Sequence, residues 1–162
     1  MTGVRTFRVK SRLASLAFTP GGLPAKEAVK RAEAGIEVLR PPCLADVDAS
    51  LAEIVGRFGK GAPGRDHADL DTLYDLSSRV IECAIGLPDS GIDLAARALC
   101  EFVDQSIEHG VRDWEVIDIH IISLRLLRAE GQAMSGDQRA AVIEGLAKVT
   151  RKRSGGAPEA LT

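Results

Sequence analysis

Hydrophobic residues recur along most of this chain at spacings of three and four, the pattern of an α-helix with one buried face. The pattern is clearest from Leu70 to Val103, where two such arms flank the short segment 87–91. The first arm carries Leu70, Leu73, Leu76 or Ser77, Val80 and Ala84, and the second carries Ile92, Ala95, Leu99, Phe102 and Val103. Pro88 cannot continue a helix and Ser90 is a candidate cap, so the short link forces antiparallel packing. The sequence therefore predicts a central helical hairpin.

Two further helices are predicted before the hairpin. An apolar stripe runs from Ala25 to Leu39, and the pair Pro41-Pro42 is expected to end that helix. A second helix is predicted from Leu44 to Phe58. The glycine-rich segment 59–64 lacks the Gly-Lys-Ser/Thr ending of a phosphate loop, so we interpret it as a flexible linker.

Two more helices are predicted after the hairpin. Residues 114–129 are apolar nearly all round, which indicates a buried helix with Asp113 as its N-cap. The isoleucine-rich part of this run, 116–122, leaves a strand as the alternative. The segment 135–138 has the form of a capping box and starts a final helix. We therefore predict an all-α fold, an antiparallel helical bundle with a four-helix core and additional terminal helices.

The charges divide the chain into three parts. Residues 1–23 form a basic arm with Arg5, Arg8, Lys10 and Arg12, residues 24–153 form the bundle domain, and residues 154–162 form a loose tail. We interpret the arm as a segment held by a few apolar anchors, with a membrane-surface or partner-binding arm as the alternative.

The composition excludes several classes of function. The 162 residues are 45% hydrophobic and 27% charged, as in an ordinary globular chain. Aromatic residues make up only 4%, too few for a site that stacks on bases or sugars, and a net charge of −2 gives no general attraction to nucleic acid. No apolar run approaches a membrane span. We expect a cytoplasmic protein that binds neither nucleic acid nor membrane.

No catalytic set can be assembled from the sequence. There is no acidic pair, Ser/His/Asp set or Cys/His set, so we predict a protein that is not an enzyme and holds no cofactor or metal. Cys43, Cys83 and Cys100 lack metal or disulfide spacing and are expected to be buried, inert thiols. His120 has two interpretations: a core imidazole bonded to a neighbour, or a phosphoacceptor.

The hairpin resembles the histidine phosphotransfer (HPt) domains of bacterial phosphorelays. The residues that carry the likeness are Gly91-Ile92, Ala95, Ala98, Leu99 and Phe102. The family's His-x-x-Lys-Gly motif is missing, because no histidine occurs between His67 and His109. The resemblance implies a helical bundle of HPt shape without its phosphoacceptor.

Most of the chain is also similar to the small chemotaxis accessory proteins called CheE. The residues that suggest this are Lys10-Ser11-Arg12-Leu13-Ala14, Pro20-Gly21-Gly22, Ala32-Glu33-Ala34, Cys43-Leu44, Val47-Asp48, Ile117-Asp118-Ile119-His120 and Leu124-Arg125. This resemblance implies a role in chemotaxis signalling through protein contacts.

The resulting hypothesis is a non-catalytic adaptor of two-component signalling that binds a receiver domain or a histidine kinase. We expect the partner to contact the edge near Arg79, Glu82 and Arg97. One alternative is an active histidine phosphotransfer protein that uses His120. The other is a structural or localisation protein that acts through its N-terminal arm. The sequence leaves the oligomeric state open.

Overall fold

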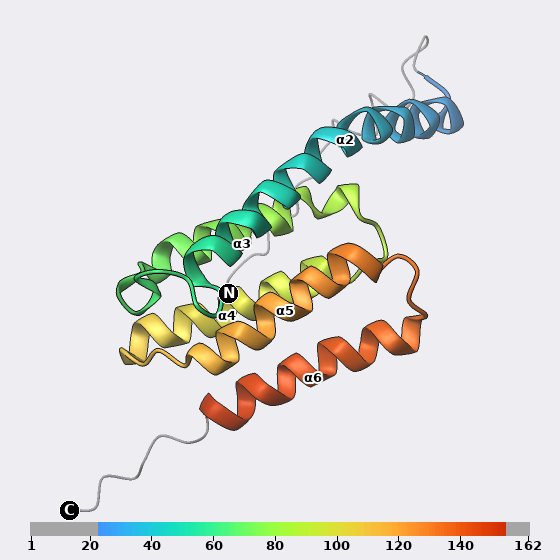
Figure 1. Cartoon of the computed structure of the whole chain (residues 1–162). Coiled ribbons are helices and arrows are strands. Elements are labelled where there is room, and N and C mark those ends of the chain that lie inside the picture. The colour runs from blue at the N-terminus through green and yellow to red at the C-terminus, as the bar shows by residue number, and fades with distance from the viewer. Residues whose placement is uncertain (1–22, 155–162) are drawn as a thin grey trace, which may run out of the picture. The chain divides into compact units, whose positions relative to one another are not determined.

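A computed structural model describes residues 23–154, which form five α-helices and two short 3₁₀ turns, with no strand among them. The helices are α2 (Ala25–Phe58), α3 (Leu70–Cys83), α4 (Ile92–His109), α5 (Trp114–Glu130) and α6 (Gly136–Ser154), and the 3₁₀ turns are η1 (Arg65–His67) and η2 (Ala84–Gly86) (Figure 1). The predicted all-α class is confirmed. Apart from Leu23 and Ser154, the predicted basic arm and tail lie outside the described residues.

The chain divides into two compact units, Met1–Glu37 and Val38–Thr162. In the first unit the described residues form the beginning of α2, where Arg31 Nε lies 3.2 Å from Glu27 Oε1. This pair joins residues one helical turn apart and is exposed, so it adds little to stability. The second unit holds the remainder of α2 together with α3, α4, α5 and α6.

The second unit is a helical bundle organised around the predicted hairpin. Helix α4 packs on α3, α5 and α6, and α5 also packs on α6 (Figure 1). Its hydrophobic core takes residues from every helix, with α2 contributing Val47, Leu51, Ile54 and Phe58. The hairpin residues Leu73, Val80, Ile92, Leu99 and Val103 are fully buried, as the three- and four-residue spacing predicts.

The prediction that Pro41-Pro42 ends a helix is wrong, because α2 continues through both prolines. A proline inside a helix has no N–H for the carbonyl four residues earlier. Pro41 and Pro42 are exposed, so no buried polar group is left unsatisfied. Tertiary contacts hold the helix on both sides of the prolines: before them Arg40 Nη1 donates to the Gly86 carbonyl at 3.2 Å, and after them Val47 is buried.

The predicted starts of α5 and α6 agree with the structure. The Asp113 carboxylate accepts from the backbone N–H groups of Glu115 and Val116 at the start of α5, which excludes the strand alternative. Ser135 and Gln138 form a reciprocal capping box before α6. Helix α4 ends at His109, and Gly110 follows with a φ of 66°.

The connection from α2 to α3 is held to the start of α5 by two arginines. Arg65 Nη2 lies 3.1 Å from Asp118 Oδ2 and donates to the Trp114 carbonyl, and its guanidinium lies 4.6 Å from the Trp114 ring centroid. In return, Arg112 donates to two backbone carbonyls of the connection, each at 2.9 Å. The segment 59–64, predicted to be a flexible linker, is therefore the first part of a connection anchored by side chains.

Candidate functional site

A groove of about 340 Å³ lies between α2 and α3 and contains two of the three predicted contact residues. It is lined by Asp46, Ala49, Ser50, Glu53, Leu76, Arg79, Glu82 and Cys83. Arg97, the third predicted residue, is exposed on α4 and is not part of this lining. The structure thus brings Arg79 and Glu82 together and places Arg97 elsewhere.

The charge of this groove is mainly acidic. Asp46, Glu53 and Glu82 supply three carboxylates against the one guanidinium of Arg79. Glu53 Oε1 is already paired with Arg57 Nη1 at 2.8 Å on the same helix. Among the described residues, no three His, Cys, Asp or Glu side chains gather so that they could hold a metal ion. The groove is thus lined mainly by charged side chains.

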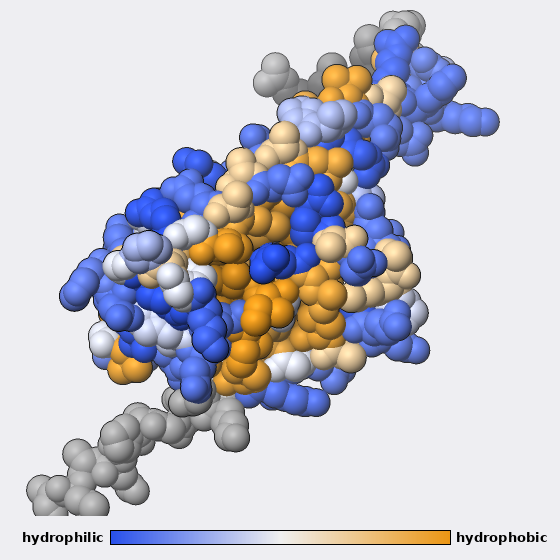
Figure 2. All heavy atoms as spheres, in the orientation of Figure 1, coloured by the Kyte–Doolittle hydropathy of each residue, from blue (hydrophilic) through white to orange (hydrophobic). Residues whose placement is uncertain are grey.

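A second, apolar groove lies between α2 and α5. Its lining residues are Leu51, Ala52, Val55, Gly56, Ile122, Arg125, Leu126, Arg128 and Ala129. The side chain of Ile122 is 63% exposed and that of Leu126 is 40% exposed. Figure 2 shows hydrophobic atoms gathered on this face of the molecule. We call this surface the α2–α5 face.

The exposure of these residues corrects the prediction of a helix buried nearly all round. Helix α5 buries Val116, Ile117, Ile121, Leu124 and Leu127, but leaves Ile119, Ile122 and Leu126 exposed. Helices α4 and α6 pack against α5, and Ile119, Ile122 and Leu126 lie outside these contacts with solvent access. Hydrophobic residues on every face of a helix allow each face to be buried. Which faces are buried depends on where the neighbouring helices pack.

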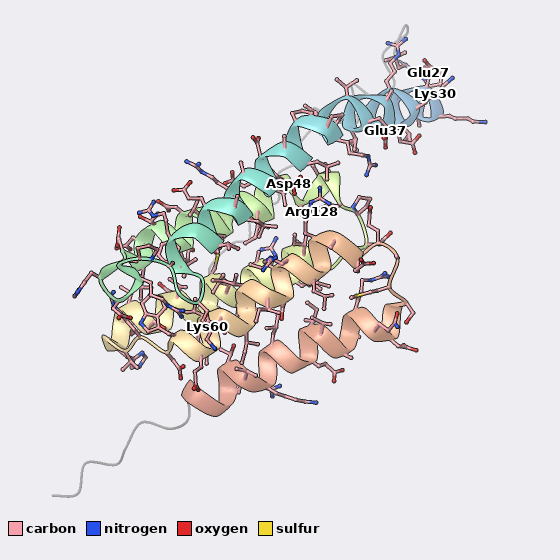
Figure 3. All side chains as sticks on the ribbon, in the orientation of Figure 1. Glu27, Lys30, Glu37, Asp48, Lys60 and Arg128 are labelled. Carbon is pink, nitrogen blue, oxygen red and sulfur yellow. The ribbon has the colours of Figure 1, made fainter. Side chains whose placement is uncertain are left out.

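One ion pair crosses the α2–α5 face. Arg128 of α5 donates to both carboxylate oxygens of Asp48 of α2, at 2.7 Å and 2.9 Å (Figure 3). Two parallel bonds of this kind orient both groups. Arg125, one turn before, is exposed and lines the same groove. The α2–α5 face therefore combines apolar side chains with a neutralised pair and a positive charge.

His120 lies in the core of the bundle and is fully buried. Its Nδ1 lies 2.9 Å from the Val116 carbonyl oxygen, and its ring stacks on Phe102 with 5.8 Å between centroids. Burial lowers the pKa of the imidazole below its usual value, and the bond to Val116 opposes that shift. The imidazole is inaccessible to a phosphodonor in this structure, which supports the interpretation of His120 as a core residue.

None of the helices in the described part of the chain is long and apolar enough to cross a bilayer.

Two of the three cysteines depart from the prediction of buried thiols. Cys100 is buried, whereas Cys43 and Cys83 are only partly buried. Cys43 lies in α2 and Cys83 lies in α3, 40 residues apart in the sequence. Their spacing in the sequence therefore does not indicate whether they are close in the structure.

Neither the protein-family models, nor the curated proteins, nor the solved structures that were compared with this chain gave a match. The resemblances to HPt domains and to CheE proteins therefore stay predictions. The fold and the surfaces of the chain itself are the basis for a functional proposal.

Proposed function

We propose that this protein is a non-catalytic adaptor of two-component signalling, which binds a receiver domain or a histidine kinase in a chemotaxis system. The choice of system comes from the HPt-like hairpin and the CheE-like residues. The main observation that supports the adaptor role is the α2–α5 face, which is apolar and exposed. His120, the candidate phosphoacceptor, is buried.

The chemistry of the α2–α5 face suits a protein partner. An apolar area with a polar rim is the usual anatomy of a protein interface. A partner that covers Ile122 and Leu126 gains about 1–2 kcal/mol from each side chain removed from water. The exposed Arg125 favours a partner that has a carboxylate beside its apolar residues. Such a charge pair affects the orientation of the bound partner more than its affinity.

The α2–α3 groove supplies a second contact of different character. Arg79 and Glu82 are both exposed there, with Asp46 on the facing helix. Charged residues at such positions affect the association rate and its dependence on salt. We assign the main share of binding energy to the apolar face and a steering role to this groove.

Calorimetric titration against receiver domains and histidine kinases of the same organism tests the proposal. Receiver domains are titrated with and without beryllofluoride, which mimics phosphorylation. We expect saturable one-to-one binding in roughly the micromolar range of transient signalling contacts. A difference between the two receiver states then identifies the state that the adaptor senses.

Two variants locate the interface. Ile122→Asp places a charge at the centre of the α2–α5 face and is expected to weaken binding at least about tenfold. Val111→Asp is the matched control, because Val111 is 60% exposed, close to the 63% of Ile122, and lies in the connection from α4 to α5. Equal affinity of both variants, or flat traces with every receiver and kinase, would contradict the proposal.

A further inference from the structure

Two cysteines that are far apart in sequence meet where α3 ends beside α2. Cys43 lies in α2 just after Pro41-Pro42, and Cys83 is the last residue of α3. Cys83 Sγ lies 4.0 Å from Asp46 Oδ2, one turn along α2 from Cys43. A Cβ built on Gly86, three residues after Cys83, would lie 3.3 Å from Cys43 Cβ. Cys43 therefore packs against η2, the turn that directly follows Cys83.

The two thiols also influence one another. Burial raises the pKa of the Cys83 thiol, and the neighbouring Cys43 and the Asp46 carboxylate raise it further, in that order. This direction agrees with the geometry, in which Cys83 Sγ reaches Asp46, one turn along α2 from Cys43. Both side chains are partly exposed, and Cys83 lines the α2–α3 groove, so a small reagent can reach the pair.

Cys100 provides the contrast within the same chain. It is buried in α4, where its sulfur lies 3.8 Å from Ser78 Oγ and 3.8 Å from the Tyr74 carbonyl oxygen. Its polar neighbours are thus the hydroxyl of Ser78 and the backbone carbonyl of Tyr74, both on α3. A reaction that needs two adjacent, accessible thiols is open to Cys43 and Cys83 and closed to Cys100.

We infer that Cys43 and Cys83 are a dithiol site that is converted to a reversible disulfide by a low-molecular-weight disulfide oxidant, which links α2 to α3. The inference is independent of the adaptor role. The bond ties α2 to the bundle immediately after its two prolines and closes one end of the groove that holds Arg79 and Glu82.

The reaction is two successive thiol–disulfide exchanges with an oxidant RSSR. One cysteine thiolate attacks RSSR, forms a mixed disulfide and releases RS⁻. The second thiolate attacks the protein sulfur of that mixed disulfide and releases the other RS⁻. Each RS⁻ takes up one of the two protons lost by the cysteines, so the products are one protein disulfide and two RSH, and two electrons have passed to the oxidant. Because only thiolates attack, the rate is expected to rise with pH.

The test uses the full chain and glutathione disulfide as the oxidant. We expect intact mass to show the loss of two hydrogens, and peptide mapping without reductant to join the peptides that contain Cys43 and Cys83. Dithiothreitol is expected to reverse the change. Closure of a loop of roughly 40 residues raises the melting temperature of the oxidised protein by roughly 5–10 °C.

Variants identify the pair. Cys100→Ser is expected to cross-link like the wild type, and Cys43→Ser is expected to lose the cross-link while its circular dichroism spectrum stays helical. Dibromobimane, which becomes fluorescent when it bridges two nearby thiols, gives a second measurement on the wild type that needs no variant. Stable mixed disulfides alone, disulfide-linked dimers, a bridge to Cys100, or no reaction with either reagent would each overturn the inference.

Discussion

His120 is expected to make the stability of the protein depend on pH. A carbonyl oxygen can only accept, so Nδ1 must donate its proton to the Val116 carbonyl across the 2.9 Å contact. In the neutral ring Nε2 then carries no proton, and it has no hydrogen-bond partner among the described residues. Protonation would place a charge and an unpaired donor in the core, which is why burial lowers the pKa of His120.

The direction and size of the effect follow from this lowered pKa. The unfolded chain takes up a proton near the ordinary pKa of 6.5, whereas the folded chain does so only at lower pH. The stability from a neutral His120 is therefore fully present above pH 6.5 and is lost as pH falls below it. If the native ring stays neutral, the free energy of unfolding decreases by about 1.4 kcal/mol between about pH 7.5 and about pH 5.5.

Urea denaturation of the wild type and of His120→Leu at both pH values measures this contribution. Other titrating groups are common to both proteins, so the wild type is expected to lose more than the variant, by at most about 1.4 kcal/mol. Ile117→Val is the packing control, because Ile117 is equally buried on α5. It should cost about 1 kcal/mol at both pH values and leave the pH dependence unchanged. Equal losses in wild type and His120→Leu would refute the reasoning.

Other predictions concern single positions that hold the fold. Arg65→Ala removes a largely buried guanidinium from its ion pair and its aromatic contact and is expected to cost about 2 kcal/mol in urea denaturation. Arg57→Ala removes an exposed pair on one helix and a longer aromatic contact, 5.6 Å from the Phe58 ring centroid, and should cost about 1 kcal/mol or less, so equal losses would contradict the role given to Arg65. Gly110→Ala, at a φ of 66° with open space around it, is expected to lower stability by about 1 kcal/mol through backbone strain alone. Gly145→Ala, inside α6 and also in open space, should raise stability by about 0.5–1 kcal/mol, and a gain at both glycines would be evidence against the strain argument.

Much of the helical framework could be predicted because its causes are local. The positions of the caps at Asp113, Ser135 and Gly110 depend on side chains and backbone groups within four residues. The buried faces of α3 and α4 follow from a spacing that places apolar residues on one side of each helix. Caps and buried faces depend only on residues within one turn or one helix, so the amino-acid sequence was sufficient to predict them.

The candidate sites were predicted only in part. Arg79 and Glu82 were expected at an interaction edge, and they do share a groove, but Arg97 lies on another helix outside it. Both interpretations of His120 were compatible with its position among apolar residues. Its complete burial depends on how Phe102 of α4 meets α5, and no pattern within α5 contains that information.

What the sequence determined by itself is the four helices α3 to α6, the caps at Asp113 and Ser135, and the buried faces of α3 and α4, since each depends on neighbours within a few residues. Tertiary structure alone decided three features: that α2 passes through Pro41-Pro42, that Ile122 stays exposed, and that Cys43 and Cys83 lie near one another. Each depends on which helices pack together. The sum of many weak contacts between distant segments sets that packing, and no local pattern encodes such a sum.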